Sequence, residues 1–448
     1  MELAQFRSCP LTIIACLLTL VKAAMHKSLS NLSSLLSLSL VCVSAISAGK
    51  ETVAAKIQMG IDVLQANNYS ILKGKRVGLL THKAGVNRDG VSTILLLHRS
   101  HQVNLRALYG PEHGIDGVAQ AEAKVNSGTH RQTGLPVYSL YGEYRKPIPS
   151  MLQGIDVMVV DLQDVGVRSY TYVSCMKLTM EACFENNKQV IILDRPNPLG
   201  GIKVDGPLME EVWESYVGPF PTPYVHGLTI GEIARMAKAT PGWLDVDERV
   251  RQRGQLIILS MRGWHRRMLW TDTGLSWIAT SPNIPNLSAV LGYPMTGLGA
   301  QIGGFKHGIG TEYPFRLLTF PDVPAQQLQQ RLTQMKIPGL LFELKPFIQS
   351  NGRRETGVYT TVTDYYSLRP TELSFYMMKL AAEFQGWNPF KNVRFSHERL
   401  FNKHVGSTAW WKALETQGAR VNVAAWVDHW EKQSFAFREK SKRFWLYK

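Results

Sequence analysis

The segment IDVMVVDL, residues 155–162, is the strongest strand signal in the chain and decides the predicted fold. Its residues are mostly β-branched and apolar at every position, which is typical of a central strand in a parallel sheet that is covered on both faces. A second apolar run, QVIIL at 189–193, follows a predicted helix over 171–186. Apolar strands that alternate with helices predict an α/β fold with a doubly wound parallel sheet and right-handed crossovers.

The same alternation extends to both sides of this segment. Further strands are predicted at 76–82, 105–109, 136–140 and 256–261, and further helices at 52–66, 91–98 and 229–238. The last helix is expected to begin after Thr229, because Glu232 three residues later completes a capping box. From residue 315 the pattern becomes strand, helix, two strands and then helices, which predicts a smaller α+β domain.

Length and composition agree with two globular domains. The chain has 448 residues, of which 45% are hydrophobic and 19% are charged, and single cores usually stop growing at about 250–300 residues. We predict a doubly wound domain over 52–297 and a C-terminal α+β auxiliary domain over 298–448. The glycine-rich stretch 297–310 is expected to be a mobile loop near the site, at the boundary between them.

The first 48 residues resemble an export leader. They contain two apolar patches, three basic residues, one acidic residue, and the small-residue ending VSAISA at 43–48. Met25 is an alternative start for this leader. The other interpretation, a membrane anchor, fits less well because serines interrupt the run short of the ~20 apolar residues that a span needs. We expect an exported protein in the periplasm or cell envelope, without stable membrane insertion once the leader is removed.

The cysteine spacing bears on disulfides, and the net charge bears on the class of partner. Cys175 and Cys183 lie eight residues apart on one predicted helix, about 12 Å along its axis, which is too far for a disulfide. The net charge is +15, and +13 without the leader's three basic and one acidic residues, so an anionic partner is favoured. We expect no nucleic acid, because the basic residues are dispersed and an exported chain meets cell-wall polymers first.

Polar residues follow four of the predicted strands. Since parallel strands bring their carboxyl ends to one edge of the sheet, these loops should converge on a single site. They carry His82 and Asn87; Glu112 and His113; Asp161, Gln163, Asp164 and Arg168; and Asp194, Arg195 and Asn197.

Two carboxyl groups would make this site a glycosidase, which needs a protonated acid and a second group for water or the oxocarbenium charge. Glu112 is the candidate acid, because partial burial beside Pro111 favours the protonated form. Asp161 or Asp164 would take the second role. The alternative for both aspartates is structural: capping the helix expected to start near residue 169, or pairing with Arg168.

Other residue types leave the chemistry partly open. Arg168 and Arg195 could each clamp a substrate carboxylate, or each could pair with a neighbouring aspartate. Three histidines at 82, 113 and 226, together with Asp161, could hold a divalent metal, although no HxH or HExxH spacing supports this. The sequence has no GxGxxG, no P-loop and no GxSxG, which argues against nucleotide use and against a serine hydrolase.

From about residue 60 to the end, the chain resembles the exo-β-N-acetylmuramidase (NamZ-type) family. The resemblance rests on YGPEHG (109–114), TGLPVYSLYG (133–142), RKP (145–147), GIDVMVVDLQDVGVRSYTY (154–172), ILDRPNPLGG (192–201), VDGP (204–207), HGLTIGE (226–232), SPNIP (281–285), GTEYPF (310–315) and SLRP (367–370). It implies a Rossmann-like domain that bears the cleft, a C-terminal domain that covers it, and no metal or organic cofactor.

The resemblance also implies a function. The enzyme would release N-acetylmuramic acid from the non-reducing end of peptidoglycan fragments, with Glu112 at the position of the family's catalytic glutamate. The predicted catalytic residues are Glu112, Asp161 and Asp164; the predicted substrate-binding residues are His113, Gln163, Arg168, Tyr170, Asp194, Arg195, Asn197, His226 and Asn283. The expected partners are muramyl saccharides derived from peptidoglycan.

One departure from the family pattern keeps an alternative open. Members often carry a glutamate in the glycine-rich stretch, where this chain has Ala300 and Gln301, and Glu312 is the nearest acidic residue. A non-catalytic protein that binds muramyl sugars is therefore the second hypothesis, and a metal-dependent hydrolase is the third.

Overall fold

The computed structural model describes residues 57–349 and 351–448, so the predicted leader at 1–48 lies outside the described residues. The first described helix, α3, spans Gly60–Ala66, and residues 52–56 of the helix predicted over 52–66 lie outside the described residues. Its predicted N-terminal part is partly extended, because Gln58 exchanges backbone hydrogen bonds of 2.9 and 2.8 Å with Arg262.

The predicted parallel sheet is present, with seven strands in the order β3-β4-β2-β1-β5-β6-β7. The strands are β1 Arg76–Thr81, β2 Asn104–Gly110, β3 Gly128–Thr129, β4 Pro136–Ser139, β5 Val157–Asp161, β6 Gln189–Leu193 and β7 Leu256–Leu259. All neighbours are parallel except β3, which runs antiparallel to β4. The chain begins in the middle at β1, moves outward to β4, and then continues on the other side of β1, which makes the sheet doubly wound.

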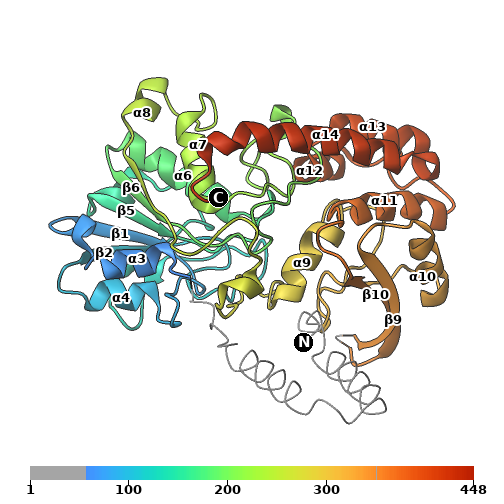
Figure 1. Ribbon diagram of the computed structural model, residues 1–448, viewed down its shortest axis with the longest axis horizontal. Coiled ribbons are helices and arrows are strands. Elements are labelled where there is room, and N and C mark those ends of the chain that lie inside the picture. Colours follow the sequence, from blue (N-terminus) through green and yellow to red (C-terminus); the bar gives the residue numbers. More distant parts are fainter. Residues whose placement is uncertain (1–56, 350) are drawn as a thin grey trace, which may run out of the picture. The chain divides into compact units, whose positions relative to one another are not determined.

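Helices cover both faces of this sheet (Figure 1). They are α3, α4 Thr93–Arg99, α5 Pro149–Leu152, α6 Tyr172–Glu185, α7 Ile230–Ala239 and α8 Glu248–Arg253. Alternate residues of β5 point to different layers: Val157 and Val159 pack in the cluster that contains α3 and α4, whereas Met158 and Val160 pack with α6. A strand buried on both faces explains why the segment at 155–162 is apolar at every position.

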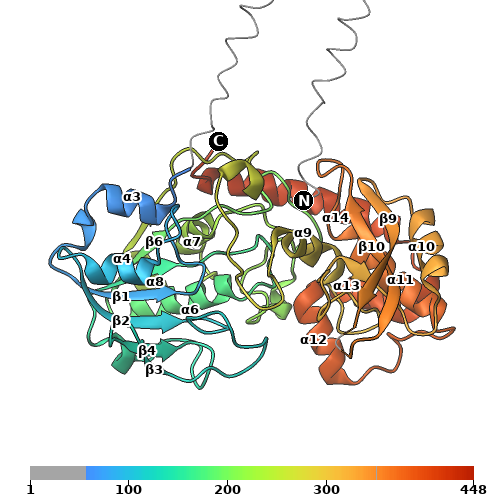
Figure 2. The same cartoon turned by 90° about the horizontal axis from the view of Figure 1, so that it is seen from below.

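The C-terminal part has a second, smaller sheet in the antiparallel order β8-β10-β9 (Figure 2). Its elements are α9 Leu287–Thr296, β8 Leu317–Leu318, α10 Ala325–Gln334, β9 Leu340–Ile348, β10 Arg354–Val362, α11 Glu372–Phe384, α12 Phe395–Val405, α13 Thr408–Gln417 and α14 Val423–Ser441. Short 3-10 turns lie at Ser70–Leu72, Glu211–Trp213, Trp270–Thr273, Gly418–Arg420 and Lys442–Phe444. This agrees with the predicted α+β class, while the boundary at residue 297 stays a prediction.

In the described part of the chain, no helix combines the length and apolar character that crossing a membrane requires. The two described cysteines, Cys175 and Cys183, are buried and unpaired on α6, as predicted. Burial raises the pKa of each thiol to about 12.

The glycine-rich stretch 297–310 is packed against the C-terminal core, in contrast to the mobile loop predicted. Phe305 is buried and contacts Phe320 edge-on, with ring centroids 4.9 Å apart, and the backbone at residue 306 exchanges two hydrogen bonds with residue 319. A Cβ on Gly299, whose φ is +72°, would lie 2.1 Å from the Met378 side chain. The glycine there permits a close approach between the loop and α11, which sequence alone does not distinguish from flexibility.

Helix α7 starts with the predicted capping box. Thr229 Oγ1 accepts the backbone N–H of Glu232 at 3.2 Å, and the Glu232 carboxylate accepts the backbone N–H of Thr229 at 3.1 Å. Glu232 is fully buried, and Arg266 neutralises it in an ion pair of 2.7 Å. The same carboxylate accepts the backbone N–H of Leu446 at 2.9 Å, so it also binds the end of the chain.

The chain returns to the first sheet after α14 and ends beside α7 (Figure 1). Tyr447 donates its hydroxyl proton to Asp194 Oδ2 at 2.5 Å and accepts the backbone N–H of Met261 at 2.9 Å. Asp194 directly follows β6, and residue 261 lies shortly after β7. The last residues of the chain therefore join the ends of two neighbouring strands.

Replacing Tyr447 by Phe should lower the free energy of unfolding by about 1–3 kcal/mol, because the buried Met261 N–H and Asp194 lose their partner. Urea unfolding of the Tyr447→Phe protein measures this. Tyr366→Phe is the matched control, since the Tyr366 side chain is 68% exposed. Equal stability of both variants would show that the C-terminal contact contributes nothing.

Candidate active site

The loops that carry the predicted site residues lie at one edge of the sheet. In the parallel register, Thr81 at the end of β1 pairs with Asp161 at the end of β5, and Gly110 at the end of β2 pairs with Ser139 at the end of β4. Strand β6 runs parallel beside β5. The turn with Glu112 and the loops after β5 and β6 therefore meet at the carboxyl edge, where ligands bind in doubly wound sheets.

Glu112 is held between two loops at this edge. Its side chain is only 6% exposed, and the backbone turns sharply behind it, because His113 and Gly114 both have positive φ, +69° and +77°. Thr171 donates its hydroxyl proton to Oε2 at 2.5 Å, and the backbone N–H of Glu122 donates to Oε1 at 3.0 Å. The two donors orient a single carboxylate from opposite directions.

Tyr141 interacts with Glu112. The two residues follow the paired ends of β2 and β4, where Gly110 lies opposite Ser139. Burial raises the pKa of Tyr141, and the negative charge of Glu112 raises it further. The phenol therefore remains a neutral hydrogen-bond donor beside the carboxylate.

Asp164 lies on the loop from β5 to α6, the same loop whose Thr171 binds Glu112. Its Oδ2 accepts the backbone N–H of Gly166 at 2.7 Å and faces Nε2 of His226 at 3.5 Å. His226 Nδ1 accepts the N–H of Leu228 at 3.2 Å, which assigns the ring proton to Nε2. Oδ1 of Asp164 has no hydrogen-bond partner in the described residues, so this carboxylate retains capacity for a ligand.

Several other buried polar atoms near this loop lack a partner among residues 57–349 and 351–448. They are His82 Nδ1, Gln163 Oε1, the Tyr170 hydroxyl, His226 Nε2 and Thr280 Oγ1. Thr280 lies close to this loop, because its backbone carbonyl accepts the hydroxyl proton of Tyr172 at 2.7 Å. Buried polar groups are normally hydrogen-bonded, so this concentration around one loop indicates a place built to bind a polar ligand.

The protonation of His82 is settled by its surroundings. Its Nε2 accepts the backbone N–H of Gln163 at 3.0 Å, so the proton of the neutral ring lies on Nδ1. Burial lowers the pKa of His82 well below 6.5, and the nearby charges of Arg195 and His113 lower it further. His82 therefore supplies an uncharged N–H donor.

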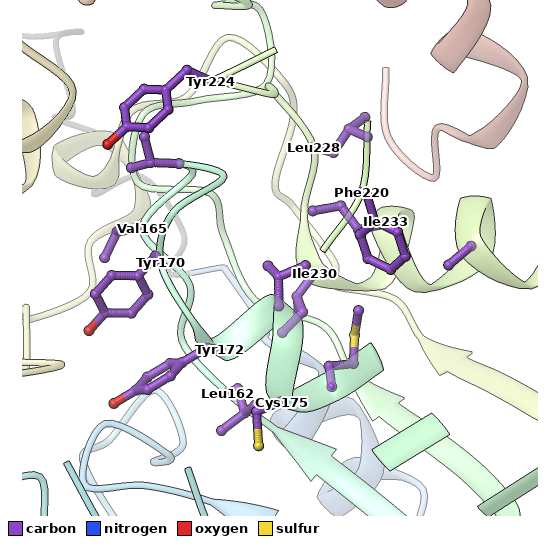
Figure 3. Packing of buried hydrophobic residues seen from close by; sticks show 14 of the residues in the cluster. Leu162, Val165, Tyr170, Tyr172, Cys175, Phe220, Tyr224, Leu228, Ile230 and Ile233 are labelled. Carbon is purple, nitrogen blue, oxygen red and sulfur yellow. The ribbon is translucent and has the colours of Figure 1, made fainter. Parts of the chain in front are cut away.

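Tyrosines surround this group of atoms. Figure 3 shows Tyr170, Tyr172 and Tyr224 with their rings in the apolar core and their hydroxyl groups turned to one side, away from Ile230 and Ile233. Burial raises the pKa of Tyr170, and the Tyr224 hydroxyl lies 2.7 Å from Ser169 Oγ. The site is thus lined by neutral hydroxyl groups on rigid rings.

Asp161 and Arg195 form a buried ion pair, which is the pairing alternative left open for Arg195. Arg195 Nε donates to Oδ1 at 2.6 Å and Nη2 donates to Oδ2 at 2.9 Å, while Thr93 donates to Oδ2 at 2.6 Å. Asp161 is fully buried. Its contacts are those of a structural anchor, which leaves Asp164 as the better placed second carboxylate.

The predicted pairing of Arg168 with a neighbouring aspartate is wrong, and its binding of a substrate carboxylate stays a prediction. Its guanidinium donates to four backbone carbonyls: those of Pro207 and Thr222 from Nη1, and those of His404 and Val405 from Nη2. Burial lowers its pKa to about 10. Arg168 therefore ties the β5–α6 loop to the end of α12. Nor does either aspartate cap α6, whose N-cap is Thr171.

Four further predicted binding residues have structural contacts. Asp194 accepts hydrogen bonds from Tyr447, Thr229 Oγ1 and two backbone N–H groups, while burial raises its pKa to about 6. Asn197 bonds the backbone of residues 199 and 228, at 3.0 Å each. His113 Nδ1 lies 2.8 Å from the carbonyl of residue 119, and Asn283 is half-buried in its turn. Their role in substrate binding stays a prediction.

A cavity of about 260 Å³ opens at the same edge, near the point between β1 and β5 where the strand order reverses. It is lined by the loop after β1 at 84–90, by Gln163 and Arg195, and by the segment from Trp270 to Ile278. Glu112 is not among its lining residues. Gln163 connects the two features, because it lines this cavity and its Oε1 is one of the buried atoms without a partner.

The metal alternative finds no support in the described residues, which contain no group of three or more histidine, cysteine or acidic side chains able to hold an ion. Asp161 is bound by Arg195, and His82 Nε2 is occupied by a backbone N–H. Thr171, Tyr141 and Thr280 are site residues that sequence reasoning missed, although the first two lie in the matched motifs at 154–172 and 133–142.

Comparison with known proteins identifies the family. The family model described as "Exo-beta-N-acetylmuramidase NamZ, N-terminal" matches residues 77–288, and the corresponding C-terminal model matches residues 291–447. The peptidoglycan beta-N-acetylmuramidase NamZ of Bacillus subtilis (strain 168) is 35% identical over 396 residues, which cover 88% of this chain and 92% of the relative.

Two solved structures share the fold. A DUF1343 family protein from Bacteroides fragilis NCTC 9343 is 37% identical, with a TM-score of 0.79, over 88% of this chain and 99% of that one. A second DUF1343 protein from the same strain, 23% identical with a TM-score of 0.65 and the same coverage, shows the fold alone. With both family models matched in order along the chain, the protein belongs to the exo-β-N-acetylmuramidase NamZ family.

Proposed function

We propose that this protein is an exo-acting glycoside hydrolase that releases N-acetylmuramic acid from the non-reducing end of peptidoglycan fragments. Membership of the NamZ family and 35% identity to a peptidoglycan β-N-acetylmuramidase support this reaction. The structural observation that carries it is Glu112, a nearly buried carboxyl group fixed at the carboxyl edge of the sheet by Thr171 and the N–H of Glu122. Such an edge is where this fold class places its ligands.

In this mechanism Glu112 is the general acid. It protonates the glycosidic oxygen as the bond to the anomeric carbon breaks, so that the leaving sugar departs as a neutral alcohol. Thr171 and the N–H of Glu122 fix the direction of the carboxyl group, and closely positioned acids are effective because no reorganisation is needed during the reaction.

Asp164 takes the second role. Its free Oδ1 can stabilise the positive charge of the oxocarbenium-like transition state or accept a proton from the attacking water. The Gly166 N–H binds the other oxygen at 2.7 Å and keeps the side chain in place, with His226 Nε2 facing the same oxygen at 3.5 Å. Gln163 and Tyr170 supply neutral polar groups for the hydroxyl and acetamido groups of the sugar.

Replacing Glu112 by Gln should lower kcat on muramyl disaccharide by at least about 100-fold, because the sugar hydroxyl is a poor leaving group without a proton and the amide cannot donate one. The matched control is Glu122→Gln: that side chain is exposed, and only its backbone N–H binds Glu112. A Glu112→Gln protein that cleaves at the rate of the control would remove Glu112 from the mechanism.

The glycine-rich stretch favours one other candidate, a protein that binds muramyl sugars without cleaving them. Ala300 and Gln301 provide no carboxylate there, and Glu312 is exposed. Product analysis of the wild-type protein with muramyl disaccharide separates the two functions. Released N-acetylmuramic acid supports the hydrolase, and saturable binding without release supports the second candidate.

We also propose that no metal takes part. The wild-type rate on a chromogenic N-acetylmuramide should stay within about 20% after dialysis against EDTA, since the groups argued to act here are carboxyl, hydroxyl and amide groups. A loss of activity in EDTA that Zn²⁺ or another divalent ion restores would contradict this mechanism.

Export to the periplasm or cell envelope is a further part of the proposal, supported by the leader-like composition of residues 1–48. Expression of the full chain should yield a mature protein in the envelope fraction that begins near residue 49, as N-terminal sequencing would measure. An uncleaved N-terminus in the cytoplasmic fraction would contradict export.

A further inference from the structure

Arg145 lies just beyond the carboxyl end of β4, in the matched RKP motif at 145–147. Its guanidinium carbon is 3.9 Å from the ring centroid of Tyr141 and 4.2 Å from that of Tyr216. The two centroids are 5.7 Å apart, so the guanidinium occupies the corner between the rings. The residue is nevertheless exposed to solvent. An exposed arginine held against two aromatic rings has a fixed position, and its N–H groups remain available to a ligand.

The same two tyrosines connect Arg145 to Glu112. Tyr141 interacts directly with Glu112, just beyond the paired ends of β2 and β4. Burial is the largest influence on the pKa of Tyr141 and of Tyr216, and it raises both. The charge of Glu112 also raises each pKa, whereas Arg145 lowers it. The guanidinium and the proposed catalytic carboxyl group therefore both interact with the same pair of tyrosines.

Three other arginines near this edge are bound within the structure, although Arg168 Nε has no partner in the described residues. Arg195 binds Asp161, Arg266 binds Glu232, and Arg168 binds four backbone carbonyls. Arg145, by contrast, forms no ion pair with a carboxylate anywhere in residues 57–349 or 351–448. Its fork of N–H donors matches a carboxylate in two parallel hydrogen bonds, a geometry that lysine does not offer.

We propose that Arg145 is the specificity-determining residue for muramyl sugars and binds the lactyl carboxylate that distinguishes N-acetylmuramic acid from N-acetylglucosamine. This inference rests on the proposed function and names the group that recognises the substrate's charge. Tyr141 and Tyr216 position the guanidinium, while Glu112 acts on the glycosidic oxygen of the same sugar.

The test compares two chromogenic substrates: the N-acetylmuramide with its free lactyl carboxylate, and the same compound with a neutral lactyl amide. In Arg145→Gln, kcat/KM for the acid should fall about 10- to 100-fold, the effect of losing a hydrogen bond to a charged group. Activity on the amide should change by less than about twofold. Arg145→Lys should lie between, because it keeps the charge without the fork.

The control is Arg131→Gln, an exposed arginine on the turn before β4, which should leave both substrates unchanged. A second variant, Lys83→Gln, tests the exposed cation on the loop after β1. An equal loss on the two substrates in Arg145→Gln, no loss on either, or a selective loss in Lys83→Gln alone would overturn the assignment.

A binding measurement separates this inference from the proposed hydrolase activity. Calorimetry of free N-acetylmuramic acid and N-acetylglucosamine requires no turnover. Wild-type protein should bind the acidic sugar more tightly, and Arg145→Gln should remove that preference, even if the wild-type protein cleaves neither substrate. Unchanged preference in Arg145→Gln would overturn the role of Arg145 and leave the catalytic proposal intact.

Discussion

The buried pair between Asp161 and Arg195 is the interaction on which the candidate site depends. Both side chains are almost inaccessible to solvent, and the guanidinium binds both carboxylate oxygens. Arg195 also donates to the carbonyl of Val86 in the loop after β1. One ion pair therefore joins the ends of β1, β5 and β6. Removing one partner of such a pair typically costs about 3–5 kcal/mol, because the other charge stays buried without compensation.

The charged groups at this edge of the sheet have two kinds of role: some hold the structure together, and others are available to act on a substrate. Asp161, Asp194 and Arg168 have their hydrogen-bonding positions largely filled by the protein, and they hold loops and helix ends together. Glu112 and Asp164 stand on the loops so held and face other polar groups. Asp164 keeps Oδ1 without a partner, and Glu112 has a single donor on each oxygen, so both carboxyl groups retain lone pairs for a ligand.

The tyrosines contribute both to the packing of the core and to the polar lining of the site. The rings of Tyr170, Tyr172 and Tyr224 belong to the main hydrophobic cluster, which also includes Phe375 and Trp410 from the C-terminal helices. Their hydroxyl groups point to the same side, away from Ile230 and Ile233 (Figure 3). Packing of the rings sets the positions of the hydroxyl groups, and the C-terminal helices take part in that packing although the proposed catalytic residues all lie on loops of the first sheet.

The alternation of strands and helices, the parallel sheet, the capping box at Thr229 and the position of Glu112 at the carboxyl edge could all be predicted from the sequence. Hydrophobic periodicity, apolar runs and turn residues are properties of neighbouring residues, so they can be read without the tertiary structure. The tertiary structure alone decided which charged groups pair: Arg195 with Asp161, Arg168 with four carbonyls more than 30 residues away, and Arg145 with two tyrosine rings. It also made the glycine-rich stretch a packed segment. Long-range partners depend on how distant segments fold together, and no spacing within one loop encodes them.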